Sequence, residues 1–581
     1  MKIINNIFKL FLFTTLLTVS SCETLDLDQL DNPSTLPPDK LDPVYVMNYV
    51  QLTLPDFVYS ANAFTQRVTR QMAMTGGISY NNAFAPVNFD NNWTTGYLML
   101  NSIKLMEPRA VANEQTFILG ATKVMRSYIL LTMVDMYGDI PYSEALQGNA
   151  NPRPRFDKSE DVYAGIYQEL NDAIVELNKA DKAEGALKAR DLYYGSGNEG
   201  NPNKDGWVKL ANTLKLKMLV TSRVPGGFGG LNLANEINTL VSSGQIINSS
   251  ADDFAFRYGT ERDLPNSRHP QYNDHYEFGG GAYIANYFMW AVGVEKGSVA
   301  DPRLNYYFFR QATLGTNMNS QTVPCDGFAR PGHYNLDEYA SFYDGNIRAP
   351  FCISNPSSES LSFLGRDHGD ASGIPLDEDL RSVVGVYPAG GLIGSPDWVS
   401  SGTNAGLKGG LGQGIMPMVM SSYVRFLMAE AILTISGVNG DAKAELQAGI
   451  DHSVRKTVNL LPQYAPGRTG TNIPSVTAFE TSLTNYIAFV SNRYDNATPA
   501  EKLQIIIKEY YIASWGNGIE PYNNYRRTGY PDNFQPTVED GPGEYFATAL
   551  YPGASVTTNP NAPTNVRTKQ VFWADKSLDL H

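Results

Sequence analysis

The sequence contains few of the residues on which metal and thiol chemistry depend. Its 581 residues include only 3 Cys and 6 His, and no CxxC pair or HExxH run occurs. A Cys/His zinc site is therefore not indicated. Neither GxSxG nor GxxxxGK[ST] occurs, so the sequence predicts no nucleophile elbow and no phosphate loop. Positive charge is also scarce, because 45 Lys+Arg face 59 Asp+Glu for a net charge of −14, and this argues against a nucleic-acid binder.

What the chain does contain is apolar and aromatic material. It is 42% hydrophobic and 18% charged, which suits a large folded core and not a disordered chain. Tyr at 34 and Phe at 26 greatly exceed Trp at 6. After the N-terminus no run of 18 apolar residues occurs; the most apolar stretch, 124–136, contains Arg126 and Asp135. No membrane-spanning segment is therefore expected.

The first residues form a lipoprotein signal. Lys2 and Lys9 precede the apolar stretch 10–19, and two serines then lead into Cys22. This resembles a bacterial lipobox, with Val19 where leucine is usual, and predicts a signal peptide over 1–21 and acylation of Cys22. The alternative is an ordinary signal peptide with an incidental cysteine. Removal of 1–21 takes away two lysines and no acid, so the mature charge is 43 minus 59, or −16.

Residues 22–43 are interpreted as a lipidated acidic tether. The acidic stretch 23–31 resembles the export signal that sends Bacteroidetes-type lipoproteins to the outer face of the outer membrane, and a merely solvated tether is the alternative. The other two cysteines, Cys325 and Cys352, lie 27 positions apart. They either form a disulfide in an oxidising compartment or remain buried free thiols.

Helical periodicity dominates the rest of the chain. The apolar pattern predicts helices over 114–137, 207–224, 425–435, 442–460, 478–491 and 501–515. A further helix is expected to begin at an N-cap Asp157 with Glu160 three positions later. The segment Trp207–Leu214 partly fits a tetratricopeptide helix, so we expect a mainly α, tetratricopeptide-like superhelix of helical hairpins. The scaffold is expected over about 44–243 and 420–520, with a long irregular insertion over about 244–420, all within one domain, 44–581.

Several motifs together resemble one family. Tyr137-Gly-Asp-Ile-Pro-Tyr-Ser-Glu-Ala145, the helix beginning at Trp207, the run 421–431 and Tyr525-Arg-Arg-Thr-Gly-Tyr-Pro531 occur in the order seen in SusD/RagB-type nutrient-binding outer-membrane lipoproteins. The resemblance runs from Cys22 to near His581. It implies a helical scaffold with a loop-rich ligand face and a SusC-like TonB-dependent barrel as partner, over which the lipoprotein acts as a lid. It also implies a glycan or peptide ligand and a location on the outer membrane, facing the cell exterior.

Candidate ligand contacts are aromatic rings beside amides and charges on loops, because sugar C–H faces pack on rings while hydroxyls need polar partners. The segment 76–93 has this composition, with Tyr80, Asn81, Asn82 and Trp93. Tyr283 follows three glycines, and Trp398 lies in a second Gly-rich loop. In each case packing beneath a loop is the alternative, and Trp207, Trp290 and Trp515 are expected in the core.

Arg366-Asp367-His368-Gly-Asp370 is the strongest polar cluster. It either binds ligand, holds a structural calcium through its carboxylates, or forms a buried network that fixes a loop. No other metal and no cofactor is expected. The sequence therefore predicts a non-catalytic binding protein. The competing hypotheses are a surface glycoside hydrolase, since two of 59 acids can face each other, and a structural or adhesive surface protein.

Overall fold

The computed structural model describes residues 41–75, 80–180, 189–197, 200–277, 282–297, 299–309, 363, 365–369, 381–393, 409–460, 475–537 and 543–581. Residues 43–581 form one compact unit. The predicted acylation site Cys22, the pair Cys325 and Cys352, and Trp398 lie outside the described residues.

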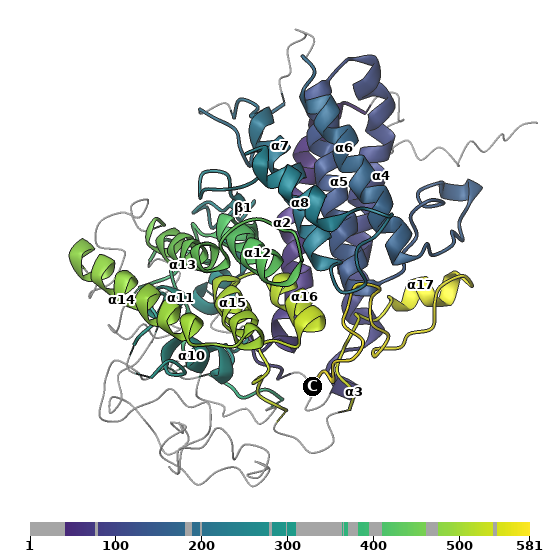
Figure 1. Ribbon diagram of the computed structural model, residues 1–581. Coiled ribbons are helices and arrows are strands. Elements are labelled where there is room, and N and C mark those ends of the chain that lie inside the picture. The colour runs from purple at the N-terminus through teal and green to yellow at the C-terminus, as the bar shows by residue number, and fades with distance from the viewer. Residues whose placement is uncertain are drawn as a thin grey trace, which may run out of the picture. The chain divides into compact units, whose positions relative to one another are not determined.

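The fold is mainly helical, which confirms the prediction (Figure 1). The first group of helices comprises α2 (Pro43–Val68), α3 (Tyr80–Ala83), α4 (Asp90–Ala112), α5 (Thr116–Tyr137), α6 (Ser159–Leu177), α7 (Lys204–Thr221) and α8 (Leu233–Ser242). The second comprises α12 (Ser421–Thr434), α13 (Ala442–Val458), α14 (Val476–Asp495), α15 (Pro499–Ala513), α16 (Ile519–Thr528) and α17 (Gly553–Thr558).

Consecutive helices pack on one another, as in a superhelix of hairpins. Helices α4, α5 and α6 lie side by side in Figure 1, and α7 packs on α6 while α13 packs on α12. Helix α5 is enclosed on nearly all sides, as its broad apolar surface predicts. Among the described residues it is the one helix long and apolar enough to cross a bilayer, but it lies inside the protein.

Some local predictions were wrong. Helix α6 begins at Ser159 after Lys158, without a side-chain cap. Asp157 instead accepts hydrogen bonds from the backbone N–H groups of Tyr142 and Ser143, so it closes the preceding loop. The sequence analysis placed 44–243 in the helical scaffold but did not single out α2 or α4, which contain Pro55 and Pro108 in their interiors.

The described part of the insertion contains short elements. These are α9 (Pro270–Tyr272), a π-helical turn (Asn273–Glu277), α10 (Asn286–Gly293), α11 (Leu304–Tyr307), and strands β1 (Phe254–Arg257), β2 (Phe308–Phe309), β3 (Val383–Val384) and β4 (Ile415–Val419). Strands β1 and β4 pair antiparallel with Phe254 opposite Val419, and β2 pairs antiparallel with β3. The first pairing brings together the two ends of the insertion.

Two buried ionic groups hold α16 in place. Glu430 on α12 accepts hydrogen bonds from Arg527 at 2.8 Å to each oxygen, and from Arg223 at 2.8 Å. Burial would raise the pKa of Glu430, but Arg527 and Arg223 outweigh it and lower the pKa to about 2. Most of the residues that carried the family resemblance thus serve the core.

Asp135 plays the matching role on α5. Its carboxylate accepts hydrogen bonds from Tyr163, from Asn523 at 2.7 Å and from the Trp573 indole N–H at 3.1 Å. Arg526 adds a hydrogen bond to the Ala547 carbonyl at 2.9 Å and lies over the Trp573 ring. The C-terminal segment is therefore anchored to α5 through α16.

Candidate functional site

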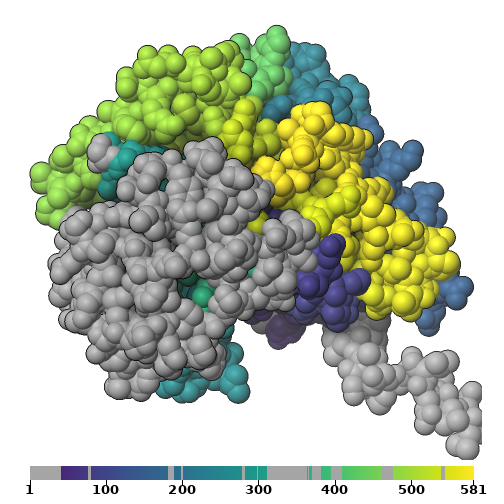
Figure 2. Space-filling model, turned by 90° about the horizontal axis from the view of Figure 1, so that it is seen from below, coloured from purple at the N-terminus to yellow at the C-terminus, as the bar shows by residue number. Residues whose placement is uncertain are grey.

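A cavity of about 440 Å³ lies between α3 and the C-terminal segment. Its lining residues are Tyr80, Pro536, Thr537, Gly543, Glu544, Tyr545, Ala547, Thr568, Gln570, Leu578, Asp579, Leu580 and His581. Figure 2 shows a purple N-terminal segment lying directly against the yellow C-terminal one on this face. Of the predicted ligand contacts, Tyr80 lines this cavity.

The backbone and ring of Tyr80 are fixed from several directions. Arg567 donates a hydrogen bond to the Tyr80 carbonyl at 2.6 Å, and the rings of Tyr545 and Phe546 pack edge-on against the Tyr80 ring. Only 2% of Tyr80 is exposed, and burial raises its pKa to about 12. Tyr80 is thus a rigid, protonated part of the cavity wall.

The hydroxyl of Tyr80 contacts the predicted polar cluster. It lies 3.0 Å from Nε2 of His368, whose backbone N–H donates to Gln535 at 3.0 Å. Gln535 in turn donates to Asp367 at 2.8 Å, as Asn286 does at 3.1 Å. The segments containing Tyr80 and His368, predicted separately, therefore meet behind the cavity.

His368 is completely buried and neutral. Burial, with the nearby Arg70 charge, lowers its pKa well below the ordinary value. A neutral imidazole has one donor and one acceptor nitrogen, and Nε2 uses one of these with Tyr80. Nδ1 is buried and has no hydrogen-bond partner among the described residues.

Arg366 and Tyr283 also meet. The guanidinium carbon of Arg366 lies 4.9 Å from the centre of the Tyr283 ring, and that of Arg381 lies at the same distance. Arg366 accepts a backbone hydrogen bond from Asn286 and donates one to Ile284. Tyr283 is half-buried between the two arginines.

Asn81 and Asn82 are exposed on α3. Asn81 lies so close to Gly543 that a Cβ built at Gly543 would stand 2.5 Å from its Oδ1, and Gly543 has a φ of +79°. Glycine at 543 thus allows α3 to approach the C-terminal segment at the cavity.

Trp93 was predicted in a loop but lies in the first turn of α4. Its ring stacks on Phe156 and packs edge-on against Tyr137 and Tyr551. Rings in contact lead from Trp93 back to the cavity: Tyr137, Phe89, Phe84, Phe546 and Tyr80. Much of the aromatic excess near the cavity is therefore packing beneath α3.

Gln570 is a cavity residue that the sequence did not indicate. Its Oε1 is buried and accepts no hydrogen bond from the described residues. A lone glutamine in the C-terminal region carries no pattern that distinguishes it, so only the structure identifies it.

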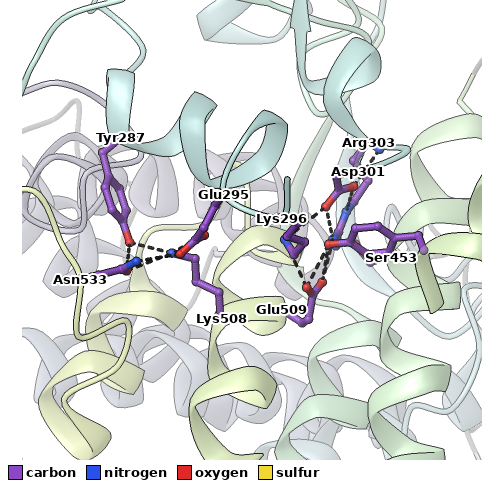
Figure 3. A network of polar contacts seen from close by, with 10 residues as sticks. Tyr287, Glu295, Lys296, Asp301, Arg303, Ser453, Lys508, Glu509 and Asn533 are labelled. Carbon is purple, nitrogen blue, oxygen red and sulfur yellow. Dashed lines mark hydrogen bonds and ion pairs between the residues drawn. The ribbon is translucent and has the colours of Figure 1, made fainter. Parts of the chain in front are cut away.

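A second polar network, missed entirely by sequence reasoning, joins the insertion to the scaffold (Figure 3). Arg303 donates to Asp301 and to Glu509 at 2.7 and 2.9 Å, and Lys296 lies 3.3 Å from Glu509. Beside it, the Lys508 ammonium reaches Glu295 and Tyr287, both at 2.8 Å. These charges balance, and their partners come from segments about 200 residues apart, so the network fixes 295–303 against α15.

The carboxylates do not gather into a metal centre within the described ranges. No group of three or more His, Cys, Asp and Glu able to hold an ion occurs there. Asp367 is bonded to amides, and Asp370 lies outside the described residues.

With this geometry in hand, comparison with known proteins identifies the family. The family described as "Starch-binding associating with outer membrane" matches residues 37–335, and "Susd and RagB outer membrane lipoprotein" matches residues 413–562. The chain belongs to the SusD-like family. No curated protein matches it significantly.

Solved SusD-like structures share the fold. A SusD/RagB family protein from Bacteroides thetaiotaomicron VPI-5482 has a TM-score of 0.61 at 17% identity, covering 91% of this chain and 98% of that one. A chitin-binding SusD homologue from Flavobacterium johnsoniae has a TM-score of 0.59 at 17% identity, covering 91% and 97%. A SusD homologue from Bacteroides uniformis ATCC 8492 has a TM-score of 0.57 at 18% identity, covering 92% and 100%.

Proposed function

We propose that this SusD-like chain is a non-catalytic surface lipoprotein that binds a glycan or an oligopeptide. Anchored through Cys22 to the outer membrane and facing the cell exterior, it acts as the lid of a SusC-like TonB-dependent barrel. Family membership supports the outer-membrane location, and a chitin-binding relative with the same fold supports a glycan ligand.

The observation that carries the proposal is the unused acceptor of Gln570 in the cavity. A buried amide oxygen without a donor is costly, and a ligand hydroxyl or amide N–H removes that cost. The adjoining Tyr80 and Tyr545 supply aromatic surface, while Thr568 and Glu544 supply polar groups. Aromatic walls with a few oriented polar groups are typical of small-ligand sites.

The test is calorimetric titration of the mature chain with oligosaccharide and peptide panels. We expect Gln570→Ala to weaken binding at least tenfold while the melting temperature stays near that of wild type. Gln168→Ala on the exposed surface of α6 is the matched control and should leave affinity unchanged. If Gln570→Ala and Gln168→Ala bind the ligand with equal affinity, the cavity is not the binding site.

The partnership with a barrel is tested separately. Affinity purification of the acylated chain from detergent-solubilised outer membranes should recover a TonB-dependent barrel in stoichiometric amount. Recovery of the chain alone would support a structural or adhesive role if glycan and peptide panels also show no binding.

A glycoside hydrolase is the second candidate, because Glu544 and Asp579 both line the cavity. Both are exposed, whereas a glycosidase acid is normally kept protonated by burial. If the purified chain cleaves an oligosaccharide, and Glu544→Gln or Asp579→Asn abolishes cleavage without loss of binding, the hydrolase reading replaces the receptor.

A further inference from the structure

The first half of α2 has an apolar face that nothing in the described structure covers. Tyr45 is 62% exposed and Leu52 is 56% exposed, and Tyr49 between them is also exposed. Their spacing of four and three residues places them on one side of the helix. No charged residue occurs from Pro43 to Pro55. The opposite side, with Met47, Val50 and Leu54, is fully buried.

Helix α4 continues this apolar surface. Asn91 donates a hydrogen bond to the Ser60 hydroxyl, which marks an exposed edge shared by α4 and α2. Leu98 and Leu105 follow Asn91 at successive steps of seven residues, so they remain on that edge, and Leu98 is 54% exposed. Along α2, Tyr49 precedes Ser60 by eleven residues, again on the same edge.

The relative direction of α2 and α4 places the exposed apolar residues of the two helices side by side. Asn92 donates to the Phe57 carbonyl, and a Cβ built at Gly96 would stand 3.1 Å from the Phe57 ring. Residues 91 and 96 of α4 thus lie opposite residues 60 and 57 of α2, so the helices run antiparallel. Leu98 and Leu105 therefore flank Leu52 and Tyr49. We call these four residues, together with Tyr45, the α2/α4 patch: Tyr45, Tyr49, Leu52, Leu98 and Leu105.

The position of the patch in the chain indicates its occupant. Cys22 and the first residue of α2 are separated by 21 positions. A chain of that length reaches at most about 70 Å even when fully extended. A lipid on Cys22 therefore keeps the start of α2 close to the bilayer. Tethering at this distance raises the effective concentration of the surface enough for a weak contact to be populated.

The chemistry of the patch fits a bilayer interface. Tyrosine has an apolar ring and a polar tip, and it is enriched where acyl chains meet headgroups. The mature chain carries −16, so its net charge does not attract it to an anionic surface. The patch itself consists of apolar and aromatic side chains, with Asp56 one turn beyond Leu52 and Lys104 beside Leu105. Exposed apolar surface of this kind usually marks a binding face.

We propose that the α2/α4 patch lies against the lipid bilayer that holds the acylated Cys22, with its tyrosines at the headgroup boundary. The first helical pair is then a second membrane contact, and it orients the cavity-bearing domain above the surface. The proposal rests on the lipid anchor assigned under the proposed function, and it is independent of what the cavity binds.

The test uses the acylated full chain in phosphatidylcholine vesicles, with the photocrosslinker p-benzoylphenylalanine placed at Leu98. Val175 on α6 is equally exposed and receives the same label as a control. After irradiation, mass spectrometry should show at least fivefold more phospholipid adduct at Leu98 than at Val175, unchanged in 0.5 M salt. Equal yields overturn the proposal, and so does an adduct to a second copy of the chain, which would assign the patch to self-association.

A second variant separates the patch from the anchor. In the labelled chain, Tyr45→Ser, Tyr49→Ser and Leu52→Ser together should lower the lipid adduct at Leu98 at least fivefold. Attachment through Cys22 and ligand affinity should both persist. Val175→Ser, Val476→Ser and Val566→Ser replace three exposed valines elsewhere and should change nothing. An undiminished adduct in the triple patch variant contradicts the proposal. The anchor is tested separately by Cys22→Ala, which should release the chain from the vesicles, whereas the patch variant should stay attached.

Discussion

The Tyr80 hydroxyl and the His368 imidazole are 3.0 Å apart, although 288 residues separate them in the chain. This contact closes α3 over the segment 365–369 at the wall of the cavity. Because Nδ1 of His368 already lacks a partner, the Tyr80 contact supplies the histidine's only side-chain hydrogen bond among the described residues.

Tyr80→Phe removes that hydrogen bond while the ring packing against Tyr545 and Phe546 is retained. We expect the free energy of unfolding to fall by about 1–2 kcal/mol, because a fully buried imidazole then has no polar partner. Chemical denaturation measures this. Tyr97→Phe is the control, since it removes a hydroxyl whose hydrogen bond to the Pro141 carbonyl lies at a half-buried position of α4. A larger loss in Tyr97→Phe would contradict the role given to the pair.

Gly543→Ala should loosen α3. The added Cβ meets Asn81, and alanine is strained at a φ of +79°, so the cost is about 1–2 kcal/mol. Hydrogen exchange of residues 80–83 is expected to accelerate, with α5 unaffected. Asn81→Ala in the same chain should recover part of the loss, because it relieves the clash but not the backbone strain. Full recovery of the unfolding free energy would show that the positive φ at residue 543 contributes nothing to the loss.

Stability should fall in acid through Glu430. Its pKa is about 2 in the folded chain against 4.5 in the unfolded chain, so the folded state binds the proton less readily. The stabilisation is complete above pH 4.5, is lost as the pH falls towards 2, and amounts to about 3 kcal/mol. The difference in unfolding free energy between wild type and Glu430→Gln should therefore shrink over this range. Chemical denaturation at a series of pH values measures this, and a difference that stays constant from about pH 6 to about pH 2 would contradict the role given to Glu430.

Arg303→Met should destabilise the protein strongly. It leaves Asp301 and Glu509 buried with Lys296 as their one remaining cation in this network, and breaking a buried ion pair costs about 3–5 kcal/mol. Arg455→Met also removes two ion pairs, with Asp451 and Glu480, but at an exposed site, where the loss of stability should be much smaller. Thermal unfolding of both variants decides the point, and equal losses would mean that the buried network contributes little.

The sequence predicted the elements with strong periodicity and missed those without it. Helix α5 was predicted to within two residues at its start, because its apolar stripes extend over six turns. Helices α2 and α4 carry internal prolines and expose apolar side chains, so they lack the strong periodicity that identified the other helices and were not predicted individually. Asp157 matched a capping sequence but bonds the preceding loop, a choice that depends on tertiary contacts.

For the candidate site, too, some features could be predicted from the sequence and others could not. Tyr80, Asp367 and His368 were predicted as ligand contacts. The structure joins Tyr80 to His368 directly and links Asp367 and His368 through Gln535, and all of these contacts cross more than 160 residues of sequence. Gln570 was not found, because its distinguishing property is an unpartnered oxygen and not its residue type. Whether these residues contact ligand stays a prediction.

The partners of the Asp135 carboxylate have consequences for the order in which the chain can fold. Its Trp573 partner is synthesised 438 residues later, and Asn523 follows it by 388. Until those residues emerge, the Asp135 carboxylate lacks its indole and amide donors and has the Tyr163 hydroxyl as its early side-chain partner. A helical protein usually folds fast through local contacts, whereas this one must wait for its far end. The core around α5 is therefore complete only when the last residues of the chain have joined it.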